Sequence, residues 1–198
     1  MPKVSQEHKD ARRDEIANAA SRAFLSKGLQ QTSMADIIAE TGLSAGAFYG
    51  HFTSKHEVIL EVARRATTNR IAELADVASR DELPEPGEVL RRMLAGLATD
   101  IEGDTRLLVQ VWGMAMVDPK VADLALEVFS DLREAYRGYF VAWAMQRRGM
   151  SEAEAEAWAA RRLPVMLGLG QGFILQAALK SDFDREQYLE VAGDLLAG

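Results

Sequence analysis

Hydrophobic residues recur every three or four positions along almost the whole chain, and no stretch alternates apolar and polar residues as a half-buried strand does. This pattern predicts an all-α protein. The first helix is expected over about residues 7–26, because Ile16 and Phe24 fall on one apolar face and Gly28 supplies a left-handed stop.

Capping signals predict three more helices in quick succession. Ser33 can begin a short helix that ends at Gly42, and Ser44 can begin a third, which continues to about His51. A capping box at residues 54–57 then opens a long helix over residues 54–79.

A polar turn with two prolines, residues 81–87, ends the long helix and marks the clearest linker in the chain. Apolar periodicity resumes after it, interrupted at Asp, Gly and Pro residues. The pattern predicts five helices over about residues 88–102, 105–117, 119–148, 152–179 and 184–197.

The composition excludes several classes of protein. The chain has no cysteine, so disulfides and thiolate metal sites are excluded and a reducing compartment is expected. Residues 1–21 are too polar for a secretory signal, which favours the cytoplasm. Residues 163–179 are nearly long enough to span a membrane, but their Pro, Gly and Gln residues favour a buried helix and no membrane partner.

Charge is unevenly distributed. The net charge is −7, yet residues 1–55 carry one more basic than acidic residue. An anionic partner should therefore prefer the N-terminal end.

No set of residues predicts catalysis, a metal site or a cofactor. The three histidines have no ligand spacing toward carboxylates. The glycines at 168, 170 and 172 follow no strand, so they fit close helix packing better than a phosphate loop.

Two short helices joined by a turn around residues 42–44 have the layout of a helix-turn-helix, although a plain helical corner has the same spacing. The third helix favours DNA binding. When Leu43, Phe48 and Phe52 point inward, small uncharged residues face outward, as a helix that enters the major groove requires.

Residues 32–55, TSMADIIAETGLSAGAFYGHFTSK, resemble the DNA-binding signature of the tetracycline-repressor (TetR) family. The resemblance implies a homodimeric cytoplasmic regulator, usually a repressor. Such a regulator leaves a palindromic double-stranded DNA operator when a small-molecule effector binds its C-terminal domain. It also implies DNA contacts at Thr32, Ser33, Ser44, Ala45, Gly46, Ala47, Tyr49, His51 and Lys55.

The signature departs from the family at two positions. Ala45 stands where the family often has lysine, and Ala47 where it often has threonine or asparagine. We therefore expect few phosphate contacts, a shallow salt dependence, and base reading through thymine methyl groups and DNA shape.

Residues 1–55 are expected to form the helix-turn-helix domain and residues 56–198 a helical bundle for ligand binding and dimerisation. Large soft side chains concentrate in the bundle, where they form core by default but also line adaptable pockets. The candidate pocket residues are Trp112, Met116, Phe140, Trp143 and Gln171.

Residues 163–179 are apolar nearly all round, so this helix should be buried on two sides, one of them against a second copy of the chain. The candidate interface residues are Leu163, Leu167, Gly170, Ile174 and Ala178.

Residues 107–119 and 167–184 also resemble the choline-responsive regulators of this family, which makes an alkylammonium effector one possibility among others. DNA half-sites about 34–36 Å apart would match the two DNA-binding domains of a dimer. An effector that binds better when these domains are spaced differently would act through the long helix over residues 54–79 and release the DNA. Two alternatives stay open: an all-α ligand carrier or enzyme with a degenerate head, and a protein-interaction adaptor. Loss of specific duplex binding in Tyr49→Ala, with the dimer intact, would exclude both.

Overall fold

The computed structural model describes residues 6–96 and 105–197, and within these ranges the fold is all-α, as predicted. The helices are α1 (Gln6–Lys27), α2 (Met34–Thr41), α3 (Ala45–Tyr49), α4 (Lys55–Ala78), α5 (Pro86–Gly96), α6 (Thr105–Ala115), α7 (Pro119–Arg148), α8 (Glu152–Leu179) and α9 (Arg185–Ala197). The end of the helix expected over residues 88–102 lies outside the described residues.

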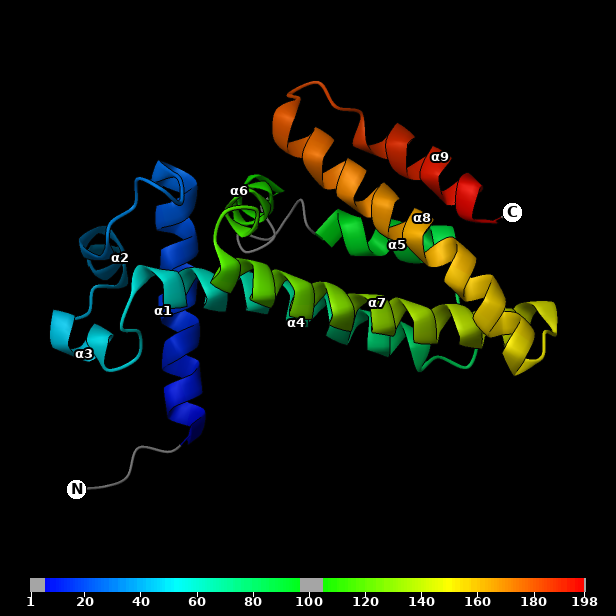
Figure 1. Cartoon of the computed structure of the whole chain (residues 1–198), viewed down its shortest axis with the longest axis horizontal. Coiled ribbons are helices and arrows are strands. Elements are labelled where there is room, and N and C mark those ends of the chain that lie inside the picture. The colour runs from blue at the N-terminus through cyan, green and yellow to red at the C-terminus, as the bar shows by residue number, and fades with distance from the viewer. Residues whose placement is uncertain (1–5, 97–104, 198) are drawn as a thin grey trace.

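Helices α1, α2 and α3 form a head at one end of the molecule, and α1 stands across the start of α4 (Figure 1). The long helices α4 and α7 lie side by side. Helix α8 packs on α6 and α7, while α9 packs on α5. The long helices thus connect the head to the rest of the bundle.

Local capping positions the head helices. Ser33 caps α2 in a capping box with Asp36, and Gly42 ends that helix at a φ of 68°. Ser54 caps α4, but the Glu57 carboxylate accepts from the N–H and hydroxyl of Thr53, one residue earlier than a capping box requires. The predicted start of α4 is confirmed, with this change in its hydrogen bonds.

The molecule has two hydrophobic cores. The core at the head end extends beyond residue 55, the expected end of the helix-turn-helix domain. The head core contains the first turns of α4, together with Leu107 and Val111 of α6 and Val121 of α7. The bundle core joins α4, α5, α7, α8 and α9. Helix α6 packs against both cores, because Leu108 and Trp112 lie against the bundle.

Among the described residues, α8 is the one helix long and apolar enough to cross a membrane by length and composition. Its inner face belongs to the bundle core, with Leu163, Met166 and Phe173 each at most 3% exposed. Its other face is exposed. The sequence predicts that this helix is buried on two sides, and the structure of the single chain shows one of them.

Candidate nucleic-acid interface and internal cavity

Helix α3 presents a small, uncharged surface. Phe48 and Phe52 are fully buried and fix the helix on the head core, and the Ser44 hydroxyl caps it by accepting from the Ala47 N–H at 3.3 Å. The exposed residues are Ser44, Ala45, Gly46, Ala47, Tyr49 and Gly50. This surface has the slim shape that a major groove admits.

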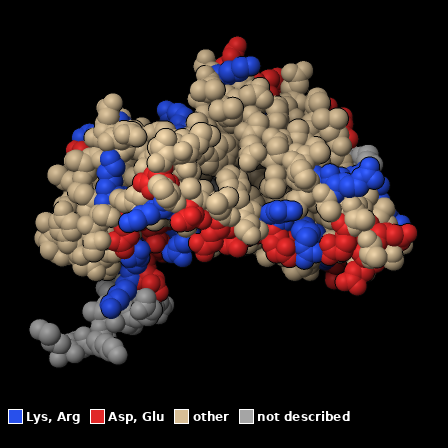
Figure 2. Space-filling view, viewed as in Figure 1, with Lys and Arg blue, Asp and Glu red and all other residues tan. Residues whose placement is uncertain are grey.

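Most cations of the head are engaged within the head. Lys27 pairs with Asp36 at 2.5 Å and Arg22 with Glu40 at 2.8 Å, while Arg12 pairs with Glu15. The hydrogen bond from Lys27, followed by those from Ser33, holds the pKa of Asp36 well below its ordinary value. Figure 2 accordingly shows the end that carries α3 as mostly uncharged surface.

The other expected DNA contacts differ in exposure. Ser33 is exposed at the start of α2, and the Lys55 ammonium donates to the carbonyl of Gln30, in the loop before α2, at 3.0 Å. His51 is half-buried. The side chain of Thr32 is not available for the expected DNA contact. It is 1% exposed, and its hydroxyl donates to the Gly28 carbonyl at 2.8 Å, so it stabilises the loop after α1.

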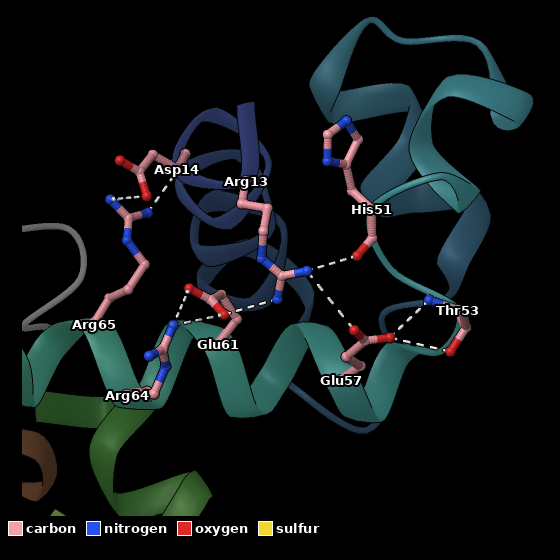
Figure 3. A network of polar contacts seen from close by, with 8 residues as sticks. All are labelled: Arg13, Asp14, His51, Thr53, Glu57, Glu61, Arg64 and Arg65. Carbon is pink, nitrogen blue, oxygen red and sulfur yellow. Dashed lines mark hydrogen bonds and ion pairs between the residues drawn. The ribbon is translucent and has the colours of Figure 1, made fainter. Parts of the chain in front are cut away.

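Arg13 of α1 joins the head to α4 (Figure 3). Its guanidinium donates to the His51 carbonyl at 2.7 Å and to the Glu61 carboxylate at 2.9 Å, and it lies 4.1 Å from the centroid of the Phe52 ring. The residues just after α3 are therefore held to α1 and α4 by one side chain.

Glu61 is the buried acid of this network, at 7% exposure. Arg64 donates to it at 3.0 Å, in addition to Arg13. Burial alone would raise the pKa of Glu61, but the two arginines hold it below its ordinary value. Arg65 adds a second link to α1 by donating to the Asp14 carbonyl at 2.9 Å.

Helix α6 makes a separate contact with the head. The Gln110 side-chain oxygen accepts from the Leu29 N–H at 2.9 Å, in the loop after α1. Leu29 is 1% exposed, so this N–H has no access to water as an alternative acceptor.

A cavity of about 120 Å³ lies on the opposite side of α6 and is lined by residues of α5, α6, α7 and α8. Its walls are hydrocarbon and aromatic, with few polar groups. The lining residues are Leu90, Met93, Leu94, Leu108, Trp112, Val128, Phe129, Leu132, Tyr136, Met166, Leu167, Gly170, Gln171 and Ile174.

Two of the five candidate pocket residues line this cavity, Trp112 and Gln171. Met116 does not, because α6 ends at Ala115 and leaves it 84% exposed in the following turn. Phe140 and Trp143, which were also expected to line the pocket, do not line this cavity. They pack on Trp158 with ring centroids 5.5 and 5.3 Å away, inside the bundle core.

Three of the five candidate interface residues line the cavity instead: Leu167, Gly170 and Ile174. Leu163 is 3% exposed within the core and Ala178 is half-buried. The apolar residues that α8 and α9 expose are Val165, Leu175, Leu179, Val191 and Leu195.

The cavity walls that sequence reasoning missed carry a helical signal. On α6, Leu108 lies four residues before Trp112, which was predicted. On α7, Phe129, Leu132 and Tyr136 are spaced by three and four residues. Such spacing identifies one face of each helix. It does not tell a cavity wall from a core, since both are apolar.

A short exposed helix on a three-helix head, carried by a bundle with an internal cavity, defines the class of helix-turn-helix regulators. The comparisons with known proteins agree. Residues 16–62 match the family described as bacterial regulatory proteins, tetR family, and residues 86–198 match the BetI-type transcriptional repressor C-terminal domain. The chain therefore belongs to the TetR family of DNA-binding transcriptional regulators, with a BetI-type C-terminal domain.

Relatives of this family are similar over parts of the chain. The HTH-type regulator YfiR of Bacillus subtilis is 43% identical over 61 residues, which are 31% of this chain and 30% of that protein. An HTH-type transcriptional repressor of Mycobacterium tuberculosis is 36% identical over 108 residues, 52% of this chain and 54% of that protein. The match thus spans about half or less of these relatives' lengths.

Solved structures share the fold over nearly the whole chain. A TetR-family regulator from Mesorhizobium loti superposes with a TM-score of 0.74 at 21% identity, covering 95% of this chain and 96% of that one. A Saccharomonospora viridis regulator in complex with choline has a TM-score of 0.69 at 20% identity, over 94% and 95% of the two chains.

Proposed function

We propose that this regulator is a dimeric repressor that acts in the cytoplasm and leaves its operator when a small molecule fills the α5–α8 cavity. The observation that carries the proposal is the double packing of α6. Its residues Leu108 and Trp112 line the cavity, while Leu107 and Val111 belong to the head core. A ligand that moves α6 must therefore disturb the packing of the head.

DNA contact is assigned to the exposed residues of α3 and to the exposed or half-buried residues beside it in the chain, with Thr32 left out. Ala45, Gly46 and Ala47 face the bases, and Tyr49, His51 and Lys55 face phosphates. Since most head cations are already paired, each head neutralises few phosphates. With about two neutralised phosphates per dimer, one for each Lys55, the logarithm of the affinity should fall with the logarithm of salt concentration at a slope of about −2.

The second copy is expected to cover the exposed apolar face of α8 and α9. Leu179 of α8 is 72% exposed and Leu195 of α9 is 65% exposed. We expect Leu179→Glu to give a monomer in sedimentation and to lose duplex binding. Met116→Glu, which changes a still more exposed apolar residue in the turn after α6, should leave both unchanged.

The test of the proposal is selection of a random duplex pool by the purified chain, followed by sequencing. An enriched inverted repeat is expected, and Tyr49→Ala should lose it while remaining dimeric. The matched control, Met145→Ala on the exposed side of α7, should retain it. No enrichment with the unchanged chain would favour an adaptor or a carrier.

The enriched duplex then serves to test release. We expect some small molecule that binds the cavity to weaken duplex binding. If molecules shown to bind the cavity leave the duplex affinity unchanged, the repressor mechanism is wrong even though DNA binding stands.

A further inference from the structure

The chemistry of the cavity wall restricts the effector. None of the described residues that line it is charged, and the polar side chains among them are those of Trp112, Tyr136 and Gln171. A charged group moved from water into such a wall loses its hydration without gaining a counter-charge. The wall therefore disfavours both carboxylates and ammonium groups.

An aromatic cage could in principle hold a cation without a counter-charge, because the faces of several rings can surround it. The rings here are arranged differently. Trp112 and Phe129 have centroids 6.2 Å apart and planes tilted by 36°, so they pack against each other rather than across a gap. This pair does not leave two opposed faces for an alkylammonium group.

Gln171 supplies a different recognition group. It lines the cavity yet is exposed, which places it at the mouth. Its carboxamide makes no hydrogen bond within the part of the chain that the structure describes. An amide both donates and accepts, so it suits a hydroxyl or carbonyl group.

We propose that the cavity selects a neutral effector, a compact and mostly hydrocarbon molecule whose single hydroxyl or carbonyl group binds Gln171. The size agrees, since an apolar cavity of about 150 Å³ can take up benzene. The inference rests on the proposed function for the cavity's role in DNA release, but binding itself is measured without DNA.

Isosteric pairs test the charge directly. Titration calorimetry on the full chain would compare 3,3-dimethylbutan-1-ol with choline, which has the same shape and a positive charge, and benzyl alcohol with benzylammonium. We expect each neutral member to bind at least about tenfold more tightly. Equal or tighter binding of choline or benzylammonium, or no binding of either alcohol at millimolar concentration, overturns the proposal.

Two variants locate the binding. A Cβ added at Gly170 meets no atom closer than Leu94 Cδ2 at 4.0 Å, so Gly170→Leu should fill the cavity and abolish alcohol binding. Gly138→Leu, at an exposed position of α7 with nothing within 4 Å, should bind as before. Retained binding in a folded Gly170→Leu overturns the site.

Gln171→Leu separates the polar contact from the apolar one. It should weaken benzyl alcohol binding about tenfold while leaving toluene unaffected. Equal loss for both ligands would show that Gln171 does not bind the hydroxyl. If the alcohols bind as expected but duplex affinity does not change, the proposed repressor mechanism fails and this inference stands.

Discussion

The head and the bundle are stabilised in different ways. In the head, charged side chains bridge neighbouring elements: Arg13 alone contacts α4, the residues after α3 and an aromatic ring. In the bundle, apolar side chains and close backbone contacts hold helices that are far apart in the sequence. The head can therefore present α3 at a fixed angle, whereas the bundle leaves room for a cavity among interchangeable hydrocarbon contacts.

The bundle should be most sensitive at one backbone contact. A Cβ built at Gly87 of α5 would lie 2.5 Å from the Gly193 Cα of α9, a distance that the backbone must relieve by moving. We expect Gly87→Ala to lower the free energy of unfolding by about 3 kcal/mol. Chemical denaturation followed by tryptophan fluorescence measures it.

Gly193→Ala is the matched control for that contact. A Cβ at Gly193 meets its nearest neighbour, Gly87 Cα, at an ordinary 3.5 Å. This variant should unfold within about 1 kcal/mol of the unchanged chain. Equal destabilisation by both substitutions would mean that the α5–α9 packing is misplaced.

The head should be most sensitive at Arg13. Its loss leaves the buried Glu61 with Arg64 alone and frees the His51 carbonyl. We expect Arg13→Ala to destabilise the chain by about 2 kcal/mol and to weaken duplex binding. Far-UV circular dichroism suits this measurement, because every tryptophan lies in the bundle.

Arg12→Ala provides the comparison, since Arg12 has the exposed Glu15, three residues further along α1, as its one ion-pair partner among the residues that the structure describes. An exposed pair contributes about 0–1 kcal/mol. If Arg12→Ala proves as costly as Arg13→Ala, the network around Glu61 contributes no special stability.

The sequence predicts those features of the fold and the site that depend on residues close together in the chain. Ser33, Gly42 and Ser44 predicted the head helices, because a cap acts within one turn of its own residue. The membership of cavity walls depends on the rotation of each helix against its neighbours. Ile174 lines the cavity while the adjacent Leu175 is 44% exposed, and both are equally apolar.

Helix ends caused a second kind of error. The sequence predicted a helix through residue 117, and on that helix Met116 would continue the face of Trp112. The helix ends at Ala115, so Met116 turns outward. Thr32 differs for another reason: its buried hydroxyl donates to the Gly28 carbonyl of its own loop and to the Ala23 carbonyl of α1.

The contact between the two regions should be sensitive at Gln110. Gln110→Leu leaves the buried Leu29 N–H without its acceptor, and we expect a loss of about 1 kcal/mol. Hydrogen exchange should show the Leu29 amide exchanging faster, while amides of α8 keep their protection. Gln187→Leu, an exposed glutamine of α9, should change neither.

The smallest effect is expected in the pH dependence of the unfolding free energy, through Glu61. The pKa of Glu61 is lower in the folded chain than its ordinary 4.5, so the unfolded chain binds more protons below that pH. This stabilisation is complete above pH 4.5 and is lost as the pH falls through the folded value. The unfolding free energy of Glu61→Gln should therefore depend less on pH between about 5 and 3. An unchanged pH dependence would contradict the role assigned to Glu61.

The double packing of α6 also limits how such proteins can be recombined. Leu107, Val111 and Val121 belong to the head core, although they lie more than forty positions beyond its other residues in the chain. A fragment that stops at residue 55 would leave Phe48 and Phe52 without part of their surroundings. Hybrid proteins that exchange heads between relatives would need to keep Leu107 and Val111 of α6 together with the head. The part of the chain that must be exchanged as one piece is therefore larger than the DNA-binding motif.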